Sequence, residues 1–145
     1  MAKRIETIVK ELLDSIHRKN VPTRNGGEIE KGYKPDRVYE ISGKILIVEI
    51  ETSTDRKKHL GNYLKAHEYL ERNNNNGDIL MIIKERSNTK LESITEQVSK
   101  YYQWVTDLGA SAIPVQIITI AQLEKAVKMN TGLFTEAFKK IGNQL

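Results

Sequence analysis

Two acidic residues end an apolar segment of the sequence, where their carboxylates could bind a cation. Residues 45–50 read as a buried strand, and Glu49 and Glu51 stand at its end. Residues two apart on a strand point to the same face, about 6.5–7 Å apart along the chain. Burying one unpaired carboxylate is costly, and two neighbouring carboxylates repel each other. We therefore expect a positive charge beside them.

A third carboxylate belongs to the preceding strand. Asp36 begins the expected strand 36–41, which a tight turn at "SGK" joins to strand 44–51. In a hairpin the start of one strand lies beside the end of the other, so we expect Asp36 beside Glu49 and Glu51. Three converging carboxylates typically bind a hard divalent cation, and Mg²⁺ or Mn²⁺ would leave room for a phosphate oxygen.

Hydrophobic periodicity and turn residues place these carboxylates in a single domain, residues 1–145. We expect helices at 3–19, 55–72, 88–108, 120–128 and 133–141, and strands at 28–31, 36–41, 44–51, 79–84 and 113–119. This order, α-β-β-β-α-β-α-β-α-α, predicts an α/β fold with a mixed central sheet flanked by helices on both faces. Neither GxGxxG nor GxxxxGK[ST] occurs, which argues against a doubly wound nucleotide-binding fold.

Two short motifs in this frame resemble a known nuclease signature. "PD" at Pro35 and Asp36, followed by "EIE" from Glu49 to Glu51, is similar to the motif of the PD-(D/E)XK nuclease superfamily, with ExE in place of ExK. The resemblance implies the restriction-endonuclease-like αβββαβ core, which matches the order expected from residue 3 to residue 84. Within the superfamily the chain looks most like the archaeal-type Holliday junction resolvases and the smaller restriction-enzyme-like nucleases.

The resemblance also implies roles for individual residues. Asp36 and Glu49 would be the metal ligands of a Mg²⁺- or Mn²⁺-dependent DNA endonuclease, which hydrolyses backbone phosphodiester bonds. Glu51 stands at the usual lysine position and would add a ligand or orient the attacking water. Many members also use a glutamate on the first helix, and Glu6 fits that place better than Glu11 because it flanks the apolar stripe of the helix.

Basic residues close to the carboxylates suit DNA as a partner. Arg56 and Lys57 lie at or beside the inner face of the first turn of helix 55–72, so either could supply the cation that the motif lacks, and Lys57 is a catalytic candidate. With Lys58 they form a basic cluster where a DNA backbone would pass. Lys58 and Lys65 point more outward by helical phase. The net charge of +4 permits a polyanionic partner without requiring one.

Three other interpretations stay open on the sequence alone. A catalytically inactive module of the same fold would bind nucleic acid or protein, and the missing lysine favours it. A small α/β interaction protein would have no site at all, and Asp36 would be an ordinary surface residue. In the third interpretation the strand end is solvated, and Glu49 and Glu51 pair with nearby cations: Arg37, Arg56 or Lys57.

The composition excludes several classes of site and protein. The chain has no cysteine, which removes disulfides, thiol catalysis and the usual structural zinc sites, and which suits a reducing compartment. No apolar run approaches the roughly 20 residues of a membrane-spanning helix. The N-terminus also lacks the apolar block of a signal peptide. We therefore expect a cytoplasmic protein with no membrane partner.

The remaining candidate residues have ordinary structural interpretations. His67 falls on the apolar face of its helix and predicts a packed core histidine, whereas a surface role is expected for His59. Trp104 flanks the core face of helix 88–108 and is a candidate for a partner surface. The apolar side of the segment 133–141 would pack on its own domain or close a homodimer.

Overall fold

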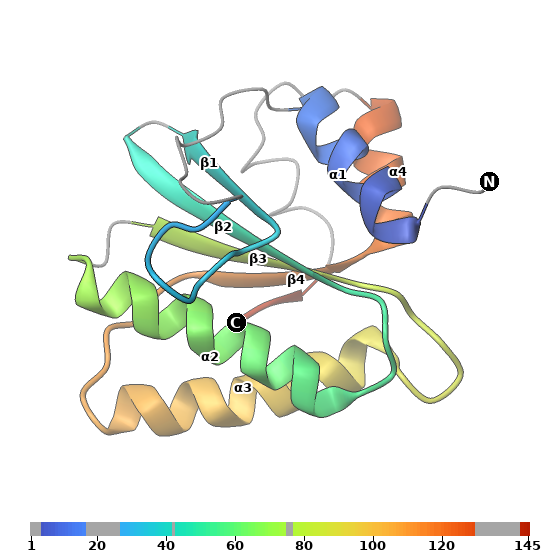
Figure 1. Cartoon of the computed structure of the whole chain (residues 1–145). Coiled ribbons are helices and arrows are strands. Elements are labelled where there is room, and N and C mark those ends of the chain that lie inside the picture. Colours follow the sequence, from blue (N-terminus) through green and yellow to red (C-terminus); the bar gives the residue numbers. More distant parts are fainter. Residues whose placement is uncertain (1–3, 17–26, 42, 75–76, 130–142) are drawn as a thin grey trace.

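A mixed β-sheet lies between two pairs of helices (Figure 1). The computed structural model describes residues 4–16, 27–41, 43–74, 77–129 and 143–145. In these residues the helices are α1 (Ile5–Ile16), α2 (Arg56–Arg72), α3 (Leu91–Asp107) and α4 (Ile120–Met129). The strands are β1 (Arg37–Ile41), β2 (Lys44–Glu51), β3 (Gly77–Ile83), β4 (Val115–Thr119) and β5 (Asn143–Gln144).

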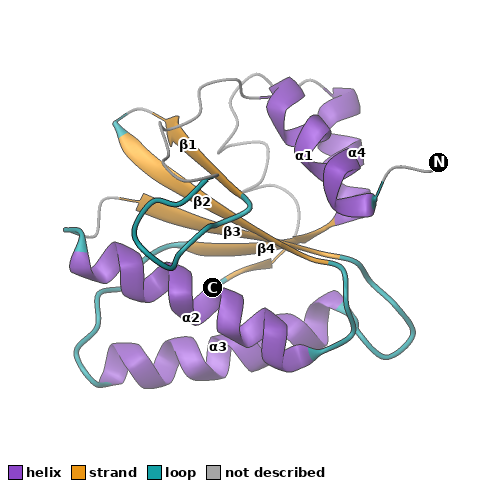
Figure 2. Cartoon of the chain, viewed as in Figure 1, coloured by secondary structure: helices purple, strands orange, loops and turns teal. Residues whose placement is uncertain are grey.

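The strands follow the order β1-β2-β3-β4-β5 across the sheet. The pairs β1–β2 and β4–β5 are antiparallel, whereas β2, β3 and β4 run parallel. Figure 2 shows α1 and α4 on one side of the sheet and α2 and α3 on the other. The expected α/β class, the mixed sheet and the helices on both faces are therefore confirmed. No helix in the described part of the chain has the length and apolar character needed to cross a bilayer.

The strand expected at 28–31 is wrong. Glu30 and Tyr33 form an isolated bridge, and the N–H of Ile29 donates to the carbonyl of Tyr33 at 3.1 Å. Gly32, with φ at +86°, lets the chain fold back on itself here instead of joining the sheet. The described chain between α1 and α2 therefore has two sheet strands, not the expected three. The helix expected at 133–141 lies outside the described residues.

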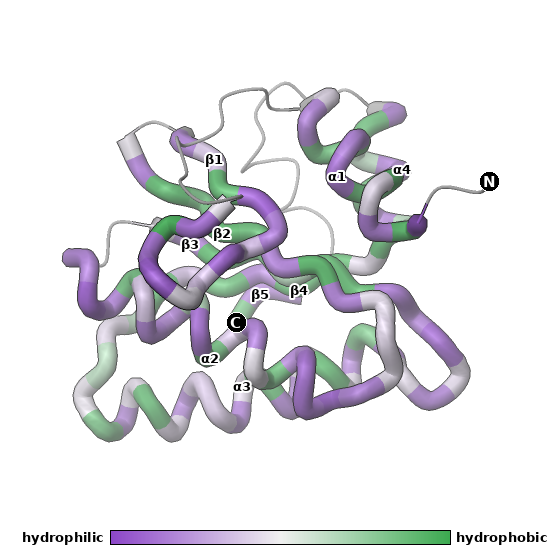
Figure 3. The backbone as a smooth tube through the Cα atoms, viewed as in Figure 1, coloured by the Kyte–Doolittle hydropathy of each residue, from purple (hydrophilic) through white to green (hydrophobic). Residues whose placement is uncertain are grey.

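Each face of the sheet has its own apolar core, as period-two alternation along the strands requires. On the α1/α4 face, Leu46, Val48 and Ile50 of β2 pack with residues of those two helices. On the α2/α3 face, Ile47 packs with Tyr63 of α2 and with residues of α3. Figure 3 shows apolar stretches along the strands and polar stretches on the connecting loops. Glu49, two residues after Ile47, belongs to the α2/α3 side.

A tight turn fixes the register of the hairpin that carries the carboxylates. Ile41 pairs with Lys44, and Gly43 has φ at +78°, which glycine adopts without steric cost. The pairing runs to Arg37 opposite Val48. The start of β1 therefore lies beside the end of β2, as the sequence predicts.

An ion pair clamps α1 to β1. The guanidinium of Arg37 donates to both carboxylate oxygens of Asp14, at 3.2 and 3.1 Å, and the Tyr39 hydroxyl donates to the same carboxylate at 2.6 Å. The Arg37 guanidinium lowers the pKa of Asp14, against the effect of burial. Asp14 lies two turns after Glu6, and Arg37 directly follows Asp36. The clamp therefore holds the helix of Glu6 against the strand that Asp36 introduces.

Asp14→Ala removes the acceptor of three hydrogen bonds and should loosen α1. We expect the free energy of unfolding to fall by about 1–2 kcal/mol, because the hydrogen bonds involve charged groups that are only half-buried. Urea denaturation measures this difference. Glu96→Ala, at an exposed position of α3, is the control and should change the stability by less than about 0.5 kcal/mol. Equal effects of the two substitutions would contradict the clamp.

Candidate functional site

The hairpin brings Asp36 and Glu49 together through reciprocal contacts with the backbone. The N–H of Asp36 donates to Oε1 of Glu49 at 3.2 Å. In return, the N–H of Ile50 donates to Oδ2 of Asp36 at 2.7 Å. Each carboxyl group is thus fixed by the strand that carries the other.

Glu49 is buried, with 6% of its surface exposed. It faces few polar partners: besides the Asp36 N–H, the hydroxyl of Tyr33 lies 3.4 Å from Oε2. Burial raises the pKa of Glu49 to about 8, and the charge of Asp36 adds to this rise. The two hydrogen bonds and the charge of Lys65 on α2 act in the opposite direction. A solvated strand end does not describe this residue.

Glu6 of α1 joins the pair from the other face of the sheet. The pKa of Asp36 is raised to about 6, mainly by burial. The charge of Glu6 and a side-chain hydrogen bond with it contribute to this rise, whereas the Ile50 N–H and the charge of Lys10 oppose it. Lys10 also pairs with Glu6 at 3.0 Å. Glu6, Asp36 and Glu49 are called the acidic cluster below.

Glu51 lies apart from the contacts that define the acidic cluster. Its carboxylate accepts from the N–H of Ser53 at 3.0 Å and from the side-chain amide of Asn62 at 3.4 Å. Both partners belong to the turn into α2 or to α2 itself. Glu51 is the last residue of β2, so its side chain can bend to the following turn although strand geometry puts it on the same face as Glu49.

The expected basic cluster lies on the first turn of α2. Arg56, Lys57 and Lys58 are all exposed, and the guanidinium of Arg56 contacts the carbonyl of Asn88 at 3.4 Å. The α2 cation whose charge reaches Glu49 is instead Lys65. Helical phase places Lys65 outward, and it is exposed. A lysine side chain, however, can extend along the surface and carry its charge several ångströms from its own Cα, which phase alone does not reveal.

The prediction for one histidine, His67, is confirmed, and the prediction for His59 is wrong. His67 is a packed core residue, since its ring nitrogens contact the Tyr63 hydroxyl at 2.9 Å and the Ser111 carbonyl at 3.1 Å. His59 is fully buried, not a surface residue. Its Nδ1 lies 2.9 Å from the carbonyl of Asp55, the N-cap of α2, so the ring packs under the first turn of its own helix.

Comparisons with protein-family models, curated proteins and solved structures found no match. The suitability of the acidic cluster for a cation therefore depends on its own atoms. Among the described residues, no three His, Asp or Glu side chains are placed to hold one ion together. The donor chemistry nevertheless fits a hard cation, because all three groups are carboxyls and burial disfavours the charge on two of them. Asp36 and Glu49, with Glu6, are the carboxyl groups that would hold such an ion.

The raised pKa of Glu49 predicts that the metal-free protein loses stability as the pH rises. Its folded-state pKa, about 8, exceeds the ordinary value of 4.5, so stability is full below about pH 4.5 and is lost as the pH rises through 8. Glu49→Gln, which stays neutral, should remove this part of the pH dependence. In EDTA, we expect the stability of the variant relative to wild type to increase by at least about 1 kcal/mol between pH 5 and pH 8.5. Urea denaturation across this range measures it, and a constant difference would contradict the prediction.

Proposed function

We propose that this protein is a metal-dependent DNA endonuclease with a restriction-endonuclease-like core, and that it hydrolyses backbone phosphodiester bonds. The observation that carries the proposal is the buried Glu49 carboxyl beside Asp36, near the C-terminal end of β2. A carboxyl pair that is only partly compensated at such a place costs folding free energy, and functional sites are where such costs are commonly found. A cytoplasmic location accompanies the proposal, since a chain without cysteine suits a reducing compartment.

In this proposal each member of the site has a role. Asp36 and Glu49 hold the Mg²⁺ or Mn²⁺, with Glu6 as a further oxygen donor from α1. When bound, the ion supplies a Lewis acid that activates water and offsets charge on the phosphate. Lys65, whose charge reaches Glu49 from α2, supplies the positive charge that the strand motif lacks. The exposed basic cluster on the first turn of α2 contacts the DNA backbone.

A second candidate is a catalytically inactive module that binds nucleic acid through the same surface. Two observations favour it. Glu51, at the position of the usual lysine, is engaged by Ser53 and Asn62, and no three acidic or histidine side chains of the described residues are arranged around one point. Mg²⁺ binding and strand cleavage separate the two candidates.

Asp36→Asn should remove metal binding while the protein stays folded. The amide keeps an oxygen for the Ile50 N–H, so the fold should persist, whereas the negative charge is lost. We expect Mg²⁺ at ten times its Kd to stabilise the wild type by about 1.4 kcal/mol and the variant by much less. Cleavage of a labelled junction or duplex should fall by more than about 100-fold, beyond the 10- to 100-fold effect of residues that only support a ligand.

Asp107→Asn, at an exposed position of α3, is the matched control and should behave as the wild type does. Thermal unfolding with and without Mg²⁺ and a gel-based cleavage assay provide the readouts. If Mg²⁺ fails to shift the wild-type melting temperature and neither substrate is cut, the nuclease proposal is wrong and the binding module takes its place.

Neutralising the basic cluster tests the DNA binding that both candidates share. In Lys57→Gln/Lys58→Gln, the slope of log K against log salt should become less steep by about 0.9 for each phosphate that the protein no longer neutralises. Fluorescence anisotropy with a labelled duplex between 50 and 200 mM salt measures the slope. Lys125→Gln on α4 should leave it unchanged, and wild-type binding without salt dependence would speak against both candidates.

A further inference from the structure

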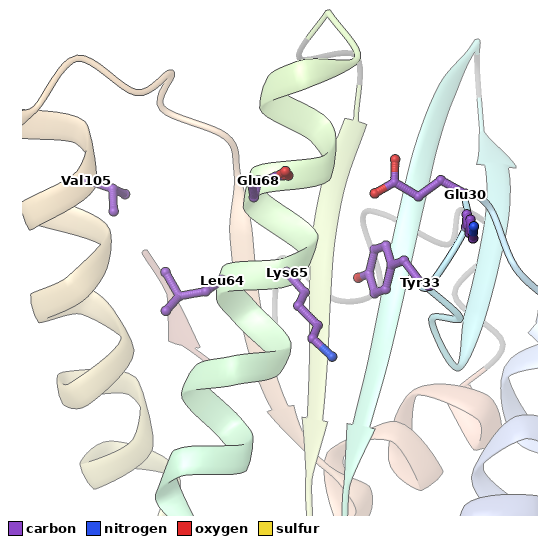
Figure 4. A pocket seen from close by; sticks show the side chains of 8 residues that line it. Glu30, Tyr33, Leu64, Lys65, Glu68 and Val105 are labelled. Atoms are coloured by element: carbon purple, nitrogen blue, oxygen red, sulfur yellow. The ribbon is translucent and has the colours of Figure 1, made fainter.

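A cavity of about 540 Å³ is lined by residues of the turn 30–33, α2 and α3 (Figure 4). It lies between the turn 30–33, the middle of α2 and Val105 of α3. Pockets of 300–1,000 Å³ commonly bind small organic groups, so one nucleotide is well within this size. Neither the acidic cluster nor the first turn of α2 includes the residues that line this cavity.

Two residues connect the cavity to the acidic cluster. Tyr33 lines the cavity, and its hydroxyl lies 3.4 Å from Oε2 of Glu49. Lys65 also lines it, and its charge lowers the pKa of Glu49. In Figure 4 the Lys65 side chain extends from α2 with its ammonium on the side of Tyr33. A ligand in the cavity would therefore have its anionic end at Lys65, next to the carboxyls.

The walls of the cavity suit a flat, partly apolar ring. Leu64 and Val105 supply apolar surface, and Tyr33, 7% of which is exposed, adds a small aromatic surface. Tyr33 is itself supported by Tyr69, with the ring centroids 5.9 Å apart. A nucleobase of any type can stack on an aromatic ring, because every base has a π-face.

The charges around the cavity favour an anionic ligand. Two carboxylates, Glu30 and Glu68, also line it, and Arg72 pairs with both of them. With these carboxylates neutralised in part by Arg72, Lys31 and Lys65 remain as the cations of the lining. Because Arg72, outside the lining, pairs with both carboxylates, these two lysines are the charges left to meet a phosphate attached to the base.

We propose that this cavity binds an unpaired nucleotide of a DNA substrate, with its base against Tyr33 and its phosphate at Lys65, directly beside the phosphodiester at the acidic cluster. The inference rests on the proposed function for the identity of the ligand. A base inside a continuous duplex is stacked and paired and does not enter such a cavity. The substrates should therefore be flaps, overhangs or junctions with unpaired nucleotides.

Binding to two DNA probes tests the cavity without relying on catalysis. One probe is a 20-base-pair blunt duplex, and the other is the same duplex with a three-nucleotide unpaired flap. In EDTA, fluorescence anisotropy should show at least about 5-fold tighter binding of the flap, the weaker end of base–aromatic stacking. Val105→Trp, which fills the cavity, and Lys65→Gln should each reduce this preference to less than about 2-fold.

Lys125→Gln on α4, on the other face of the sheet, is the matched control and should keep the full preference. Melting temperatures verify that Val105→Trp is folded, and Lys65→Gln changes an exposed residue, so the test survives if the tryptophan variant is unstable. Equal binding of both probes by the wild type overturns the inference, as does a folded Val105→Trp variant that keeps the preference.

Cleavage in Mg²⁺ distinguishes this inference from the proposed function. Cleavage of both probes at equal rates, unaffected by Val105→Trp, would support the nuclease proposal and contradict nucleotide binding in the cavity. If the cavity variants abolish a flap preference in binding and neither probe is cut, nucleotide binding in the cavity is supported and the nuclease proposal is wrong.

Discussion

The carboxyl group of Glu49 is the constraint on which the surrounding structure depends. It lies on a central strand opposite the buried Met81, where water cannot solvate its charge. Few groups compensate it: the Asp36 N–H, a long contact from Tyr33 and the charge of Lys65. These groups come from the hairpin, the preceding turn and α2, so the arrangement of three separate segments serves one side chain. Burial favours the protonated form of the Glu49 carboxyl in the metal-free protein, and a bound cation would take the place of that proton.

The positioning of the cluster follows from two local features of the chain. The turn at Gly43 fixes the register of β1 on β2, and through it the meeting of Asp36 with Glu49. The clamp between Asp14 and Arg37 then fixes α1 on β1. Arg37 follows Asp36 in sequence and points to the other face of the sheet. Residues 36 and 37 therefore hold α1 on one face of the sheet and contact Glu49 on the other.

Much of this arrangement could be predicted from the sequence, because it depends on local patterns. Period-two alternation and the "SGK" turn suffice to place Asp36 beside Glu49, and the apolar stripe of α1 suffices to favour Glu6. Composition could not show that residues 28–31, directly before the turn at Gly32, stay out of the sheet, and the two-residue β5 carries no pattern at all. The effect of Lys65 on Glu49 could not be predicted for a different reason. Helical phase describes where a Cβ points, whereas a long side chain decides where its charge lies.

Two lysines whose charges act on the acidic cluster come from helices on opposite faces of the sheet. Lys10 of α1 already pairs with Glu6 at 3.0 Å, so its charge is used within the cluster itself. Lys65 of α2 is exposed, lines the cavity and acts on Glu49 from the other face. A phosphate group carries negative charge and is repelled by bare carboxyls, so it approaches best where a cation is not already paired. If the proposed function holds, the α2 face, with the cavity and the exposed first-turn basic residues, is therefore the side from which a nucleic acid would reach the cluster.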